Sequence, residues 1–259
     1  MKIPFLEFHS LQSYNREVFL IEHSDLVKTF VAIDTNYHTL VQLPGTKRDR
    51  NGKSYVGLVP FIFLLQRQAQ SAFEALAVFQ SYQAWVLLRP GIEAALIIGK
   101  WVDDPRNAEI WKNRENDTRT YQKTYTGKRL RSKSLPDSES IQGVLHKIND
   151  DFVHANPDYY RRHLNINPAG PEFVKMVLQY VDEDNFLLTN AFAFLHLLVV
   201  TQQALLSLFN KLFSCNTALP SSRELFVRTY ADRIGKLTNL SEEHRRLMRE
   251  FGMWNTEAT

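Results

Sequence analysis

The chain has 259 residues, of which 44% are hydrophobic and 23% are charged. This composition excludes an intrinsically disordered protein, and the net charge of +3 is too small to predict nucleic-acid binding by itself. Cys215 is the only cysteine, which excludes an internal disulfide and favours a reducing cytoplasm as the location.

The N-terminal part of the chain predicts three long helices, over residues 5–43, 61–88 and 92–102. Apolar side chains in the first recur every three or four residues, as on one face of a helix. A polar, basic loop over residues 44–53 separates the first two helices. Pro90 has no amide hydrogen and disfavours helical backbone at Arg89, so a sharp kink or a break is expected before the third.

The middle of the chain is its most polar part. Residues 108–125 predict an exposed helix, and residues 126–134 a basic loop. Asp137 or Ser138 is a suitable N-cap for a helix that runs through His154. Beyond it we expect a connection over residues 165–171 and a helix over 172–180. Runs of alternating β-forming residues bounded by turns are not evident, so no strand is predicted.

Residues 185–210 form the stretch around which the other helices are expected to pack. They contain no charged residue, and apolar side chains fall on nearly every face of a helix drawn through them. Two amphipathic helices, over 223–235 and 241–251, follow. The expected fold is therefore all-α: a single multi-helix bundle with a buried central helix in the C-terminal third, and one domain over 1–259.

The same stretch is long enough to cross a membrane. However, Asn190, His196, Gln202 and Gln203 lie within it, and polar groups are costly in hydrocarbon. We therefore expect a core helix and no membrane partner, with His196 as a core histidine hydrogen-bonded to a neighbouring helix.

Two polar pairs are candidates for a catalytic site. Arg89 and Glu93 are four residues apart and would share one face of a continuous helix, as a structural ion pair or as a functional one. Asp151 and His154 are three apart, a spacing that permits a shared metal or an imidazole oriented by a carboxylate. Alternatively, His154 interacts with the dipole at a helix C-terminus.

A di-metal carboxylate bundle is a further alternative. Glu74 and Glu93 each lie beside alanines on an apolar helix and, with Asp151 and His154, would line the bundle interior. Such bundles use two Glu-x-x-His pairs, and this chain has only one comparable pair, with Asp in place of Glu. The sequence also lacks phosphate-binding glycine loops and a nucleophile motif. We accordingly predict no metal and no cofactor.

Several short motifs lie in the same order over about residues 70–165: Arg89-x-x-x-Glu93, Trp101, Asp104-Pro105, a charged helix and Asp151-x-x-His154. This arrangement resembles a set of uncharacterised bacterial all-α proteins that are distantly similar to HEPN-type helical domains. The resemblance implies a helical bundle, commonly dimeric, with a polar cleft near these residues. Some HEPN relatives are metal-independent ribonucleases of defence and toxin systems. In such an enzyme His154 would shuttle a proton and Arg89 would hold a phosphate.

The motif of those ribonucleases is Arg, four to six residues, and then a polar His near a helix start. Arg16 and His23 match this spacing but lie outside the resembling region, and one or two such matches are expected by chance from this composition.

Basic side chains form three local clusters. These are Lys47, Arg48, Arg50 and Lys53; Lys128, Arg129, Arg131 and Lys133; and Arg245, Arg246 and Arg249. The second cluster follows Tyr121 and Tyr125, so phosphate contacts and base stacking could hold single-stranded nucleic acid there. A solvated surface is the alternative.

We therefore expect a helical binding protein with an RNA or protein partner, in a bacterial stress or defence system and dimeric by resemblance. A HEPN-like ribonuclease or RNA-binding protein is the main alternative.

Overall fold

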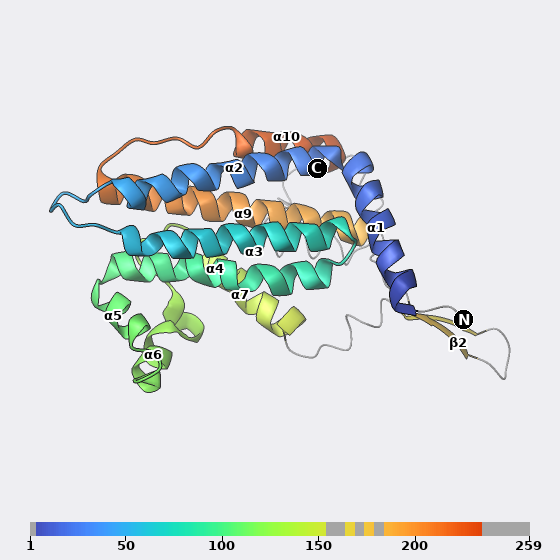
Figure 1. The fold of residues 1–259 in the computed structure, drawn as a ribbon, viewed down its shortest axis with the longest axis horizontal. Helices are drawn as coiled ribbons and strands as arrows, with labels where there is room; N and C mark the ends of the chain where they lie inside the picture. The colour runs from blue at the N-terminus through green and yellow to red at the C-terminus, as the bar shows by residue number, and fades with distance from the viewer. Residues whose placement is uncertain (1–3, 154–163, 169–173, 179–183, 235–259) are drawn as a thin grey trace, which may run out of the picture.

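The computed structural model describes residues 4–153, 164–168, 174–178 and 184–234. Nine α-helices fall within these ranges: α1 (Pro4–Glu22), α2 (Ser24–Thr46), α3 (Val59–Ala77), α4 (Ser81–Asp103), α5 (Arg106–Lys112), α6 (Thr118–Tyr125), α7 (Ser138–Ile148), α9 (Asp184–Phe213) and α10 (Ser222–Ile234). Three short helical turns are η1 (Val56–Leu58), η2 (Gly127–Leu130) and η3 (Asn149–Val153). The long helices lie side by side as a bundle (Figure 1), which confirms the all-α class.

Helix α9 is the central element of the bundle. It contacts α2, α3, α4, α7 and α10, and in Figure 1 it runs between α2 and α3. Its segment Phe186–Phe213 has the length and hydropathy of a membrane span, but 78% of its most apolar 18-residue window is buried within the structure. Burial on most sides by other helices is the arrangement predicted for residues 185–210.

Buried amide side chains join α9 to α2 and α10. Gln202 Nε2 donates to the carbonyl oxygen of Ile33 at 2.8 Å. Asn36 Nδ2 donates to Ser222 Oγ at 2.8 Å, and Gln202 Oε1 lies 3.4 Å from the same nitrogen. Asn36 is fully buried, and Gln202 and Ser222 are each 1% exposed. These hydrogen bonds satisfy polar groups that would be costly to bury alone.

A second buried hydrogen bond joins α9 to α4. Trp85 Nε1 donates to Asn190 Oδ1 at 2.7 Å, and Asn190 Nδ2 donates to the Phe186 carbonyl oxygen at 2.8 Å. Trp85 is 1% exposed and its ring lies 6.4 Å from that of Phe194. The indole N–H is therefore paired inside an otherwise aromatic contact.

The turn between α3 and α4 lies at residues 78–80, inside the segment 61–88 that the sequence predicts as one helix. Phe79 has a φ of 61°, its amide donates to the Leu76 oxygen, and the Gln80 amide donates to the Ala75 oxygen. This pair of bonds is the Schellman helix end, for which glycine is the usual residue at the left-handed position. Phe79 is 8% exposed, and its ring lies 6.4 Å from that of Phe19. Burial of the ring offsets the backbone strain, and the prediction fails because neither Gly nor Pro marks the turn.

The break that is one of the two expectations for Arg89-Pro90-Gly91 does not occur, because α4 continues through Pro90. Gly91 has a packing role instead. A Cβ at this position would lie 3.1 Å from Leu65 Cδ1 and 3.2 Å from Leu65 Cα. The absent side chain lets α4 lie close against α3, and this packing stabilises a continuous helix where an isolated Pro-Gly pair would end it.

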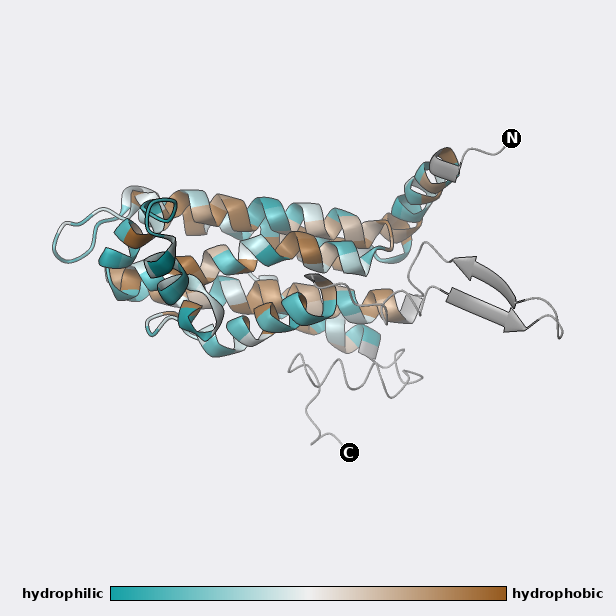
Figure 2. Ribbon diagram, turned by 90° about the horizontal axis from the view of Figure 1, so that it is seen from below, coloured by the Kyte–Doolittle hydropathy of each residue, from teal (hydrophilic) through white to brown (hydrophobic). Residues whose placement is uncertain are grey.

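Helices α1 and α2 are separate, although residues 5–43 predict one helix. The chain turns at His23, and Figures 1 and 2 show α1 running away from the bundle at an angle. Arg233 of α10 stabilises the turn. Its Nη2 donates to Asp25 Oδ1 at 2.6 Å and to the Glu22 carbonyl oxygen at 2.9 Å. Burial alone would raise the pKa of Asp25, but hydrogen bonding and the charge of Arg233 outweigh it and lower the pKa.

A β hairpin lies outside the bundle and corrects two local predictions. Strands β1 (Leu164–Pro168) and β2 (Val174–Leu178) pair antiparallel, with Leu164 opposite Leu178 and Ile166 opposite Met176. The sequence analysis expects a connection over 165–171 and a helix over 172–180. The alternation Leu-Asn-Ile-Asn in β1 is the period-two pattern that indicates a strand. The predicted helix 241–251 lies outside the described residues.

Replacing Asn36 by Ala is expected to lower the free energy of unfolding by about 2–3 kcal/mol, because Ser222 Oγ and the Pro220 carbonyl oxygen lose a buried donor. The neighbouring Thr35 is exposed, so Thr35→Ala is the control and should change stability by less than about 0.5 kcal/mol. Urea denaturation measures both. Equal losses in the two variants would contradict a structural role for the buried amides.

His196 predicts a pH dependence of stability. It packs on Phe226 of α10 with ring centroids 5.7 Å apart, and burial lowers its pKa below 6.5. The unfolded chain then binds a proton that the folded chain resists, so the free energy of unfolding falls as pH falls below 6.5. His196→Phe keeps the ring contact and should reduce this fall, measured by urea denaturation at about pH 7.5 and about pH 5.5. An unchanged difference between the two pH values would contradict the assignment.

Candidate functional site

The four predicted nucleic-acid-binding residues lie on one cleft. Lys128 and Arg129 belong to η2, and Arg131 and Lys133 belong to the loop that leads to α7. All four are exposed, and with the first residues of α7 they line a cleft of about 740 Å³. The loop predicted at 126–134 therefore contains a short helical turn, and its basic side chains face a common space.

An aspartate at the end of α4 holds this loop in place. Asp103 accepts hydrogen bonds from the backbone amides of Lys133 at 2.8 Å and Ser134 at 2.7 Å, and from the Ser132 hydroxyl at 3.1 Å. Ser132 is 4% exposed and its own amide donates to Ser138 Oγ at 2.8 Å. The loop is thus tied both to α4 and to the first residue of α7. Asp103 is not among the residues singled out in the sequence, because its role depends on a loop thirty residues later.

Gly99 makes room for the same loop. A Cβ at this position would lie 2.6 Å from Ser132 Oγ, 2.7 Å from Ser132 Cβ and 2.9 Å from Leu135 Cβ. Side chains essentially never approach so closely, so only glycine allows the loop to lie against α4 here. Gly99 and Asp103 are four residues apart and therefore share one face of the helix.

The cleft has a surplus of positive charge. Four cationic side chains line it, together with the carboxylates of Asp137 and Glu139. Arg131 Nη2 forms an ion pair with Glu139, whereas Lys128, Arg129 and Lys133 make no ion pair among the described residues.

The amino end of α7 adds to this positive potential. Asp137 precedes α7 with a φ of 54°, and its side chain makes no capping hydrogen bond. The first-turn amides therefore have no acceptor from that side chain, and the helix dipole favours negative charge at this end of α7.

The aromatic residues that precede the cluster do not line the cleft. Tyr121 and Tyr125 stack on each other with ring centroids 5.3 Å apart. Tyr125 is 2% exposed, and its hydroxyl donates to the Asn107 carbonyl oxygen at 2.5 Å. Its ring is part of the core and unavailable to a base, so the stacking contribution expected from the sequence is wrong for Tyr125.

Of the predicted catalytic residues, the structure brings Arg89 and Glu93 together on α4. Arg89 Nη1 lies 3.5 Å from Glu93 Oε2, with side chains 34% and 27% exposed, and Arg89 Nε donates to Asn149 Oδ1. Asp151 is half-buried in η3, two residues beyond Asn149. His154 lies outside the described residues. The α-helix ends at Ile148 and continues as a π turn, so the expected helical face shared by Asp151 and His154 does not follow from α7.

The structure also places Glu74, from the di-metal alternative, and the pair Arg16 and His23, from the ribonuclease motif. Glu74 points to the surface, where its Oε2 lies 3.0 Å from Arg16 Nε and its side chain is 62% exposed. It therefore does not line the bundle interior as the di-metal alternative requires. Among the described residues no three His, Cys, Asp or Glu side chains gather as metal ligands.

His23 is 6% exposed and packs on Phe19, so Arg16 and His23 do not form a common polar site.

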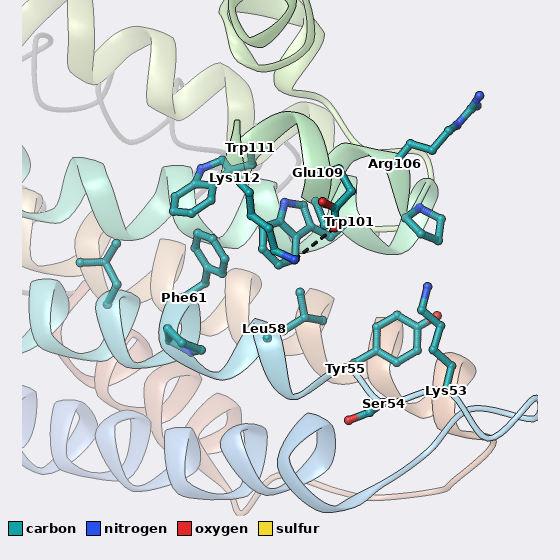
Figure 3. A pocket seen from close by; sticks show the side chains of 15 residues that line it. Lys53, Ser54, Tyr55, Leu58, Phe61, Trp101, Arg106, Glu109, Trp111 and Lys112 are labelled. Atoms are coloured by element: carbon teal, nitrogen blue, oxygen red, sulfur yellow. Dashed lines mark hydrogen bonds and ion pairs between the residues drawn. The ribbon is translucent and has the colours of Figure 1, made fainter. Parts of the chain in front are cut away.

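A second cavity, which the sequence analysis does not identify, lies between the start of α3 and the ends of α4 and α5. Its volume is about 790 Å³, and aromatic side chains of α3, α4 and α5 line it with two lysines (Figure 3). Phe61, Trp101 and Trp111 provide the rings, and Lys53 and Lys112 the amines. Trp101 and Trp111 are visible in the sequence, but only the fold shows that Phe61, forty residues earlier, completes the wall.

Comparisons of the chain with protein-family models, with curated proteins and with solved structures found no match. The structure itself establishes an all-α helical protein.

Gly99→Ala is expected to destabilise the protein by about 1–3 kcal/mol, because the new methyl group would displace Ser132 and Leu135. Gly143 of α7 is the matched control: no atom lies within 4 Å of a Cβ there, so Gly143→Ala should stabilise by about 0.4–1 kcal/mol. Thermal or urea denaturation of the two variants measures the difference. A neutral Gly99→Ala would show that the loop does not pack on α4 as described.

Proposed function

We propose that this protein binds RNA through its phosphates at the cleft formed by η2, the following loop and the start of α7. The observation that carries the proposal is the gathering of Lys128, Arg129, Arg131 and Lys133 on one cleft of about 740 Å³. Three of them have no ion-pair partner among the described residues, so their charge is available to an anion.

Electrostatic attraction between the basic side chains and the RNA phosphates would drive binding. Each phosphate neutralised by a lysine or arginine releases condensed counterions, and this release drives binding at low salt. The first residues of α7 line the same cleft, and the dipole of this helix favours negative charge at its amino end. The hydrogen bonds that Asp103 accepts hold the loop backbone in place before RNA binds. Little ordering of the loop is therefore required on binding.

The cleft supports phosphate binding more than sequence recognition. None of the described residues that line it is aromatic, and Tyr125 is buried in the core. Contacts to phosphates fix the position of a nucleic acid but do not read its bases. We therefore infer weak dependence of affinity on RNA sequence.

Binding is favoured over cleavage by the environment of Arg89. In the HEPN-like alternative Arg89 would hold a phosphate, with Glu93, Asp151 and His154 beside it. The guanidinium is instead engaged by Glu93 and by Asn149 on the neighbouring turn. The resemblance of residues 70–165 to HEPN-type domains supports an RNA partner and a role in bacterial stress or defence. It also supports a dimer, and the single cysteine supports action in the cytoplasm.

The test is fluorescence anisotropy with a labelled single-stranded RNA of about 20 nucleotides between roughly 50 and 200 mM salt. The triple variant Lys128→Gln, Arg129→Gln, Lys133→Gln should bind more weakly, with a salt dependence (log Kd against log salt) lower in slope by about 2. The matched control is Lys28→Gln, Arg67→Gln, Lys211→Gln, which removes the same charge from exposed positions on other helices.

Equal loss of affinity in the two triple variants would show that only net charge matters and would overturn the cleft as the site. RNA integrity is followed on gels in the same samples. Cleavage that disappears in His154→Ala while binding persists would support the ribonuclease alternative over a binding protein.

A further inference from the structure

The apolar pocket between α3, α4 and α5 has a preformed wall. The ring centroids of Phe61 and Trp101 are 5.0 Å apart, those of Phe61 and Trp111 are 5.1 Å apart, and those of the two tryptophans are 5.9 Å apart. Each pair meets edge to face, so each ring restricts the others. Its volume of about 790 Å³ is in the range of pockets for small organic ligands.

The polar groups that line this pocket include two primary amines, the carboxylate of Glu109 and the hydroxyl groups of Ser54 and Tyr55. Lys53 lies over the Tyr55 ring at 5.2 Å, and Lys112 Nζ lies 3.1 Å from Glu109 Oε1. The Lys112 and Glu109 side chains are 61% and 74% exposed, and an exposed pair of this kind is weak, so an incoming carboxylate can replace Glu109.

Arg106 is also at the rim but does not contribute its charge to the pocket. Figure 3 shows its side chain pointing away from the aromatic wall. Its Nη2 lies 2.6 Å from Asp104 Oδ2, and its Nε donates to the same oxygen at 2.9 Å. The cationic groups that face the pocket are therefore Lys53 and Lys112.

We propose that this pocket binds a medium-chain carboxylate, with the acyl chain along α3 and the carboxylate at the two lysines. Leu58, Phe61 and Leu64 line the pocket at three-residue intervals, which at 1.5 Å per residue gives an apolar track of about 9 Å. Lysines act as point charges and suit a single carboxylate. Lysines can also bind a phosphate, but the apolar track beside these two favours a carboxylate on an acyl chain, and Arg106 is held by Asp104.

The experiment is isothermal titration calorimetry of the full chain with sodium decanoate. Hexanoate should bind more weakly than decanoate, because its shorter chain fills less of the apolar track. Decanol, which has the same chain length and no charge, should bind at least about tenfold more weakly. Decylamine should bind more weakly still, since the amines repel it.

Variants locate the ligand. Lys53→Gln with Lys112→Gln should lower decanoate affinity by about tenfold and leave decanol unchanged. Leu64→Ser, at a position 38% exposed and so tolerant of a polar side chain, should weaken both ligands. Arg106→Gln is the control and should weaken neither, and circular dichroism confirms that each variant is folded.

Three results would overturn the proposal. The first is that no ten-carbon probe binds, as expected of a surface that only docks a partner protein. The second is that decanol and decanoate bind equally. The third is that Arg106→Gln loses as much decanoate affinity as the double lysine variant.

Discussion

The structure depends on how the uncharged helix α9 is fixed inside the bundle. Apolar burial is nearly independent of rotation for a helix that is hydrophobic on most sides, so burial alone does not choose which residue meets which neighbour. The buried amide side chains of α9 determine its rotation and position. Gln202 meets the backbone of α2, and Asn190 meets Trp85 of α4. Any rotation or shift of α9 would leave buried donors and acceptors unpaired, which gives the core a single arrangement.

Fixing α4 in this way also fixes both cavities, because its last turns hold the loop that forms the basic cleft and line the apolar pocket. Gly99 and Asp103 hold the basic loop on one side. Trp101, two residues from each, faces the other side at roughly 200° around a helix of 3.6 residues per turn, and closes the apolar pocket. The polar α5–α6 segment and the loop are then attached to this end of the bundle, where sequence analysis shows only an exposed, charged region.

The central helix and the all-α class could be predicted because they depend on composition and local periodicity. The basic cleft could be predicted in part, since Lys128 to Lys133 are close in sequence. The α3–α4 turn could not, because Phe79 takes a glycine conformation that tertiary burial stabilises. Gly91 and Gly99 have packing roles that exist only once a neighbouring element is in place. The aromatic pocket joins residues forty and more positions apart, so no local pattern indicates it.

Sharing one helical turn does not by itself couple the two cavities. Coupling requires an element with two arrangements whose balance both ligands change. The end of α4 offers the opposite: Asp103 accepts three hydrogen bonds from the loop, and Trp101 is wedged between Phe61 and Trp111. Each ligand would therefore meet a rigid wall. The same rigidity that orients the lysines and arginines toward one space predicts that the basic cleft and the apolar pocket would bind their proposed ligands independently of each other.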